Sequence, residues 1–92
     1  MSAIRVVPID DEHFGVDVTE GTTTTHHKVA VPWTVLDEIG FIDPDPAEIV
    51  EATIAFLLDR EPATALWPDF PLDQVAVKYP GFWDEIRTRL AA

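Results

Sequence analysis

Two adjacent histidines, His26 and His27, are the residues of this sequence that come nearest to metal-binding chemistry. Neutral imidazole is a ligand for zinc, copper and nickel. Both residues lie in a stretch with the alternation of a β-strand, where neighbouring side chains point to opposite faces, so they cannot chelate one ion together. A closed zinc site also needs four well-placed ligands. The sequence therefore predicts no metal site, and we interpret His27, on the face of Val29 and Val31, as a hydrogen-bonded, partly buried side chain.

A second polar cluster consists of Asp10, Asp11, Glu12 and His13. Its carboxylates are ligands of the kind that hard cations prefer, but it lacks the regular spacing and the central glycine of a calcium loop. Short polar runs between alternating segments are typical of turns. We interpret this cluster as a solvated turn between two strands.

The sequence contains few candidate residues for covalent catalysis. The only serine is Ser2, cysteine is absent, and the four glycines form no phosphate-binding loop. We therefore predict no catalytic residue, no cofactor-binding residue and no cofactor, and we expect a protein that is not an enzyme. The alternative is a small metal-dependent or acid/base enzyme, assembled from scattered Asp, Glu and His residues and Tyr79.

Aromatic side chains gather in the last third of the chain and form the possible interaction surface that we predict: Trp67, Phe70, Tyr79, Phe82 and Trp83. Large rings contribute much of the apolar area of a core. Exposed rings can instead anchor a partner protein or a second copy of the chain. Both interpretations stay open, and they can hold for different rings.

The charge of the chain excludes one class of partner. Seventeen Asp and Glu residues against six Lys and Arg give a net charge of −11, and residues 29–59 contain seven acidic residues and no Lys or Arg. Such a surface repels phosphate and favours cationic partners or simple solubility. We expect no nucleic-acid partner, and a protein partner or self-association, with a homodimer as one form.

Length and composition predict one folded domain that spans residues 1–92. An apolar content of 47% supplies a core, so a disordered acidic tail is excluded. Cysteine is absent, which excludes disulfides and cysteine-ligated zinc. No signal peptide and no apolar run of membrane-spanning length is present, so we expect a cytoplasmic protein without a membrane partner.

Strands are predicted within about residues 3–31. Phe14, Val16 and Val18 alternate with more polar residues, which is the period of a strand with one buried face. Glu20-Gly21 can form a tight turn into a third strand. The expected structure is an N-terminal antiparallel meander of three strands.

Helices are predicted within about residues 32–90, with prolines between them. The expected segments are 32–39, ended by Gly40, then 46–60, 63–67, 71–78 and a last one from Pro80 to about Leu90. The fold class is therefore α+β, with a three-stranded meander followed by four or five short-to-medium helices.

The segment 46–60 has the clearest local signals. Asp45 is predicted as N-cap, Pro46 as the first helical residue and Glu48 as a capping residue in the first turn; Asp43 precedes them. Apolar residues cover most of its circumference, so it is expected to be the central helix. Its only polar strip consists of Glu48, Glu51, Ala52, Ala55 and Asp59.

The order of a strand, a short helix and a longer helix across residues 25–60 resembles the ribbon-helix-helix family of dimeric repressors and antitoxins. The resemblance is carried by Lys28-Val29-Ala30-Val31-Pro32, Leu36, Gly40 and Glu48-Ile49-Val50. It implies a transcriptional regulator or antitoxin. That family holds DNA phosphates at the start of its second helix, where this chain has carboxylates, and the strand offers only His26 and Lys28 to base edges.

A second resemblance covers nearly the whole chain. It is carried by the strand motif Thr25-His26-His27-Lys28-Val29-Ala30-Val31-Pro32, the helix end Phe56-Leu57-Leu58-Asp59-Arg60-Glu61-Pro62, and the motifs Trp67-Pro68-Asp69-Phe70 and Tyr79-Pro80-Gly81-Phe82. These motifs look like a family of small uncharacterised bacterial proteins. The resemblance implies a compact stand-alone domain and no named activity. We therefore expect a non-enzymatic, acidic protein-interaction or regulatory module.

Overall fold

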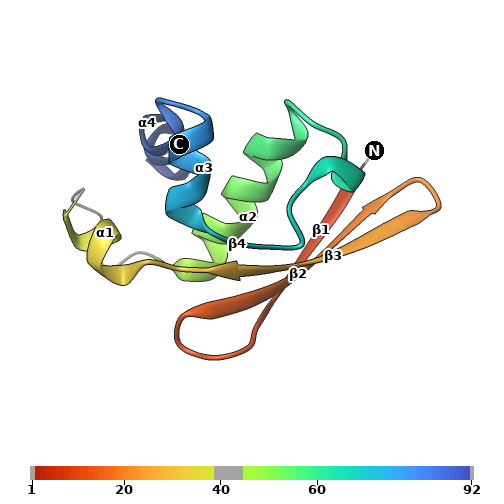
Figure 1. Cartoon of the computed structure of the whole chain (residues 1–92), viewed down its shortest axis with the longest axis horizontal. Coiled ribbons are helices and arrows are strands. Elements are labelled where there is room, and N and C mark those ends of the chain that lie inside the picture. Colours follow the sequence, from red (N-terminus) through yellow and green to blue (C-terminus); the bar gives the residue numbers. More distant parts are fainter. Residues whose placement is uncertain (1, 39–44, 92) are drawn as a thin grey trace.

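The computed structural model describes residues 2–38 and 45–91 of the chain. An N-terminal meander, β1 to β3, is followed by two helices, a short 3₁₀ turn, a fourth strand and two more helices (Figure 1). The bounds are β1 Ser2–Pro8, β2 His13–Glu20, β3 Thr23–Ala30, α1 Trp33–Glu38, α2 Pro46–Leu58, η1 Ala63–Ala65, β4 Asp69–Pro71, α3 Leu72–Lys78 and α4 Phe82–Ala91.

The sheet has four strands in the order β1-β2-β3-β4, and β4 runs parallel to β3. The prediction of a three-stranded meander is therefore wrong, although the fold remains α+β. A strand of three residues is too short to show an alternating pattern, and the prolines at 68 and 71 resemble loop boundaries. Pro71 is tolerated because β4 lies at an edge of the sheet, where a missing N–H breaks no inner ladder.

The predicted cluster of four or five helices is also wrong. Three helices, α2, α3 and α4, lie on one side of the sheet, whereas α1 lies beyond the end of β3 (Figure 1). Residues 63–67 form only the single turn η1, which is too short to count as a helix of the core. The central helix ends at Leu58 and not at residue 60. The predicted end of the first helix at Gly40 and the contribution of Asp43 lie outside the described residues.

The start of α2 confirms the predicted places of Asp45 and Pro46. Asp45 is the N-cap, and its side chain accepts a hydrogen bond of 3.0 Å from the Ala47 N–H; Pro46 is the first residue of the helix. The helix packs on the inner face of the sheet and places six residues in the interior: Ile49, Val50, Thr53, Ile54, Phe56 and Leu57. This burial agrees with the central place that the sequence predicts for α2.

One apolar core fills the space between the helices and the inner face of the sheet. The sheet contributes Val16, Val18 and Val29, and α3 and α4 contribute Leu72 and Phe82. The alternate residues of β1 to β3 point to the opposite face, which we call the open face because no helix among the described residues covers it (Figure 1). The fold therefore offers two different surfaces, the outside of the helices and the open face.

Candidate functional site

The two histidines point to opposite faces, as the sequence predicts. His27 is buried with 7% of its surface exposed, and its ring nitrogens lie 2.8 Å from the Trp67 carbonyl oxygen and 2.8 Å from Thr25 Oγ1. A carbonyl can only accept, so Nδ1 of His27 donates to Trp67. His26 lies on the open face with Nδ1 2.6 Å from an Asp17 carboxylate oxygen. His27 therefore joins the strand to the segment before β4, which confirms its hydrogen-bonded, buried role.

The cluster at residues 10–13 is a turn in which the Asp10 carboxylate accepts hydrogen bonds from backbone N–H groups. Oδ1 of Asp10 accepts hydrogen bonds of 2.8 Å from the N–H groups of both Glu12 and His13, and it lies 2.9 Å from His13 Nδ1. The Glu12 N–H is the main cause that lowers the pKa of Asp10, followed by the His13 side chain. Within residues 2–38 and 45–91, no three His, Asp or Glu side chains are placed to hold a metal ion.

The five aromatic residues of the predicted interaction surface do not form one surface. Phe70 and Phe82 are core residues with 1% and 0% exposure, whereas Trp67, Tyr79 and Trp83 are half-buried and pack against that core. A helix stripe such as that of α4 shows which residues share a face. It cannot show whether another helix covers that face.

Ring contacts tie these residues to the central helix. The ring centroids of Phe82 and Phe56 are 5.2 Å apart, and those of Tyr79 and Phe56 are 5.7 Å apart, both in edge-to-face arrangements. The Phe82 and Trp83 centroids are 4.8 Å apart. Such pairs add to the apolar burial that holds α4 on α2.

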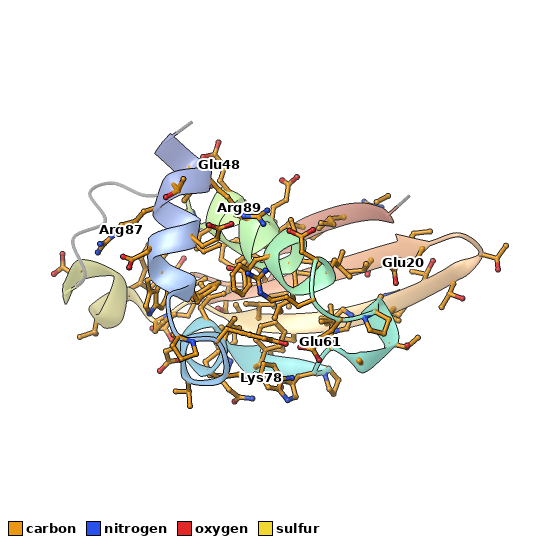
Figure 2. All side chains as sticks on the ribbon, turned by 90° about the horizontal axis from the view of Figure 1, so that it is seen from above. Glu20, Glu48, Glu61, Lys78, Arg87 and Arg89 are labelled. Atoms are coloured by element: carbon orange, nitrogen blue, oxygen red, sulfur yellow. The ribbon has the colours of Figure 1, made fainter. Side chains whose placement is uncertain are left out.

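A hydrogen-bonded carboxylate that the sequence analysis missed lies just after α2. Glu61 accepts a hydrogen bond of 2.6 Å from the Tyr79 hydroxyl and bonds of 3.0 Å to each carboxylate oxygen from Lys78 Nζ (Figure 2). Lys78 Nζ also lies 5.0 Å from the centroid of the Trp67 ring. The spacing of residues in the sequence does not predict this cluster, because Glu61 follows α2 whereas Lys78 and Tyr79 lie at the end of α3.

The pKa shifts in the cluster around Glu61 do not suit proton transfer at neutral pH. The Tyr79 hydroxyl, and then Lys78, lower the pKa of Glu61. The Glu61 carboxylate raises the pKa of both Tyr79 and Lys78. A general acid or base works best when its pKa lies near the working pH, and here all three groups move away from it. The arrangement is that of a structural cluster.

The cationic side chains of the helical layer contact other side chains of the same chain. Arg60 lies over the Phe56 ring at 3.7 Å, Arg89 Nη2 is 2.7 Å from an Asp59 oxygen, and Arg87 is 3.8 Å from Asp84. Arg5 and Lys28 belong to the open face. Within the described residues no Lys, Arg or His forms an ion pair with Glu48 or Glu51, and both residues of α2 are exposed to solvent.

A pocket of about 380 Å³ lies between α2 and α4, and we call it the α2–α4 groove. Figure 2 shows Glu48 and Arg89 close together on this side of the helical layer. The groove is lined by Glu48, Glu51, Ala52 and Ala55 of α2 and by Arg89 and Leu90 of α4. The floor is thus aliphatic and the α2 rim is acidic.

The guanidinium of Arg89 does not neutralise this rim. It is shared by Asp59 and by Glu85, whose carboxylate oxygen lies 3.5 Å from Arg89 Nε. A Lys or Arg side chain has an aliphatic stem and a charged head, and this combination fits an aliphatic floor beside unpaired carboxylates. The α2 half of the groove is the polar strip that the sequence predicts, whereas the α4 half emerges only from the packing.

Comparisons with known proteins add no relative to this picture. A scan against protein-family models, a search of curated proteins and a search of solved structures all find no match. The two resemblances read from the sequence therefore stay predictions. Within the described part of the chain, no helix has the length and apolar character needed to cross a membrane.

Proposed function

We propose that this chain is a non-enzymatic, acidic interaction or regulatory module that binds a basic segment of a partner protein in the α2–α4 groove. The observation that carries the proposal is the acidic rim of Glu48 and Glu51 above a floor of Ala52 and Ala55. As part of the same proposal we place the protein in the cytoplasm, in line with a chain that has no cysteine.

Electrostatics supports a basic partner. A net charge of −11 accelerates the approach of a cationic segment, and complementary charge then fixes its register. Exposed charge pairs contribute little singly and are screened by salt, so the aliphatic floor must contribute through the stem of the bound side chain. Binding is therefore expected to be modest in affinity and sensitive to salt.

The titratable groups in the helical layer support a role in binding over a role in catalysis. Glu61, Tyr79 and Lys78 satisfy one another, and Asp59 and Glu85 hold Arg89. The hydrogen bonds among Glu61, Tyr79 and Lys78 move the pKa of each of these three groups away from neutral pH. A catalytic acid or base needs the opposite property.

The start of α2 weighs against a nucleic-acid partner. A helix N-terminus can hold a phosphate through free N–H groups, but here Asp45 already accepts from the Ala47 N–H. In addition, both edges of β3 are hydrogen-bonded, to β2 and to β4, so this strand has no free edge for pairing with a second copy. These two observations favour a protein partner over the regulator that binds DNA.

The test is fluorescence anisotropy with a labelled peptide of alternating Lys and Ala, beside the same peptide with Glu in place of Lys. We expect the Lys peptide alone to bind, and more weakly as salt rises. The double variant Glu48→Gln, Glu51→Gln is expected to weaken binding by about tenfold, which corresponds to roughly 1.4 kcal/mol.

The matched control removes two carboxylates from exposed positions outside the groove, as Glu12→Gln with Asp73→Asn. It has the same net charge as the groove variant, and we expect less than about a twofold change from the weaker long-range field. Equal losses in both double variants would show attraction without a site. No binding of the Lys peptide at low salt would contradict the proposed function itself.

A further inference from the structure

The first strand has a long, unprotected edge. β1 pairs with β2 over seven consecutive positions without a bulge, from Ser2 opposite Glu20 to Pro8 opposite Phe14. Along its other side, which we call the β1 edge, no strand of the described chain is paired. The outward backbone N–H and C=O groups of this edge can pair with another strand.

The opposite end of the sheet has the protection that β1 lacks. β4 is only three residues long, and it consists of Asp69, Phe70 and Pro71. Short length, charge and proline are the devices by which sheets avoid pairing with other chains. In β1 the only proline is Pro8, at the last position, and the only charged residue is Arg5.

Apolar side chains lie on both faces of the β1 edge, with Arg5 between Ala3 and Val7 on the open face. Ile4 and Val6 are half-buried on the inner face, at the margin of the core. On the open face Val7 is 45% exposed, and Ile9, 56% exposed, lies over Gly15, since a Cβ at that glycine would be 3.6 Å from Ile9 Cδ1. A strand that completes this edge must therefore bring apolar side chains to both faces.

A second copy of β1 meets this requirement by its own sequence. Charge does not oppose this pairing through carboxylates, because none of the seventeen carboxylates lies in residues 1–9. This segment contains one cationic side chain, Arg5. Two chains of net charge −11 can pair these strands without bringing carboxylates face to face within the added ladder. An isologous contact of this kind closes on itself and forms a dimer, not a fibre.

We propose that two copies of this chain associate by antiparallel pairing of their β1 edges, which continues the sheet across a twofold axis. The occupant of the edge is a second copy, because β1 itself supplies the apolar residues for both faces. The proposal is independent of the α2–α4 groove, so either can fail without the other.

The test is sedimentation velocity over a concentration series, together with hydrogen exchange. We expect the mass of two chains at high concentration and of one chain on dilution. The variant Val7→Lys adds the charge that natural edge strands use, and it is expected to raise the dimer dissociation constant by about tenfold or more. Amides of β1 should exchange more slowly as the dimer forms.

The matched control is Val77→Lys, because Val77 is 84% exposed on α3 and the change in net charge is the same. It should leave the dimer intact. Ala3→Lys, at a second exposed position of β1, repeats the test in case Val7→Lys disturbs the hairpin, and circular dichroism checks both folds. A strictly monomeric wild-type chain, or a dimer that survives both lysines in β1, would overturn the proposal.

Discussion

Glu61 at the end of α2 and the pair Glu48 and Glu51 on its outer face have opposite surroundings. Glu61 is surrounded by donors, since Tyr79 and Lys78 both bind it and only 17% of its side chain is exposed. Glu48 and Glu51 point to solvent beside an aliphatic floor and form no ion pair within the described residues. In a chain of net charge −11, the position of a carboxylate thus decides its role. One set is satisfied internally and stabilises the fold, and the other is available to a partner.

The largest expected effect comes from a substitution in the packing between α2 and α4. Phe82→Ala deletes a fully buried ring that contacts Phe56, so α4 loses an aromatic contact with α2 and a cavity is left in the core. Truncating a buried phenylalanine costs about 3–5 kcal/mol, and chemical denaturation should show a loss of that size. The groove should then no longer bind the Lys peptide. Unchanged peptide binding would show that α4 plays no part in the site.

A smaller effect concerns the segment that leads from Glu61 to β4. His27→Leu removes the donor to the Trp67 carbonyl and leaves that part-buried oxygen without this partner, at a cost of about 1 kcal/mol or more. The adjacent change His26→Leu is the control, because that side chain is exposed on the open face and should shift the unfolding free energy by less than about 0.5 kcal/mol. Similar losses for both would contradict the structural role of His27.

The smallest expected effect tests the satisfied carboxylate itself. Tyr79→Phe removes the hydroxyl that donates to Glu61 and should lower the unfolding free energy by about 1 kcal/mol at neutral pH. The folded-state pKa of Glu61 lies below its ordinary value of 4.5, so its contribution is present above that pH and is lost as the pH falls through the folded pKa.

The pH dependence has a matching alkaline side. The pKa of Tyr79 is raised above its ordinary value of 10.0, mainly by the hydrogen bond to Glu61, so the part of the stability that comes from this shift is full below pH 10 and is lost as the pH rises through the raised pKa. Denaturation curves of the wild type and Tyr79→Phe should therefore converge at both extremes and differ most between them. A constant difference across the whole pH range would contradict the assignment.

Local signals explain which parts of the fold the sequence predicts. Asp45 and Pro46 define the start of α2 within a few residues, and the alternation of β2 and β3 assigns their inner faces, including the buried side of His27. These features depend on neighbours in the chain. Turn chemistry and hydrophobic periodicity are enough to find them.

Features that depend on distant residues are not predictable in this way. β4 is a strand only because β3 lies next to it, and Pro68 accepts from the Lys28 N–H through its carbonyl at 2.8 Å. The bond from Tyr79 to Glu61 joins residues 18 positions apart, and the groove needs α4 to pack beside α2. The core position of Phe70 and Phe82 has the same origin, since burial is decided by what packs on top.

The parallel pairing of β4 with β3 also has a consequence for how the chain folds. His27 and Trp67, which meet at this junction, are 40 residues apart, so the sheet cannot be completed until the intervening chain, with α2, is in place. Closing so long a loop has an entropic cost before its contacts form. We expect β1 to β3 to form early and β4 to pair with β3 late. Because β4 links the sheet to the helical segments, we also expect strands and helices to unfold as one cooperative unit.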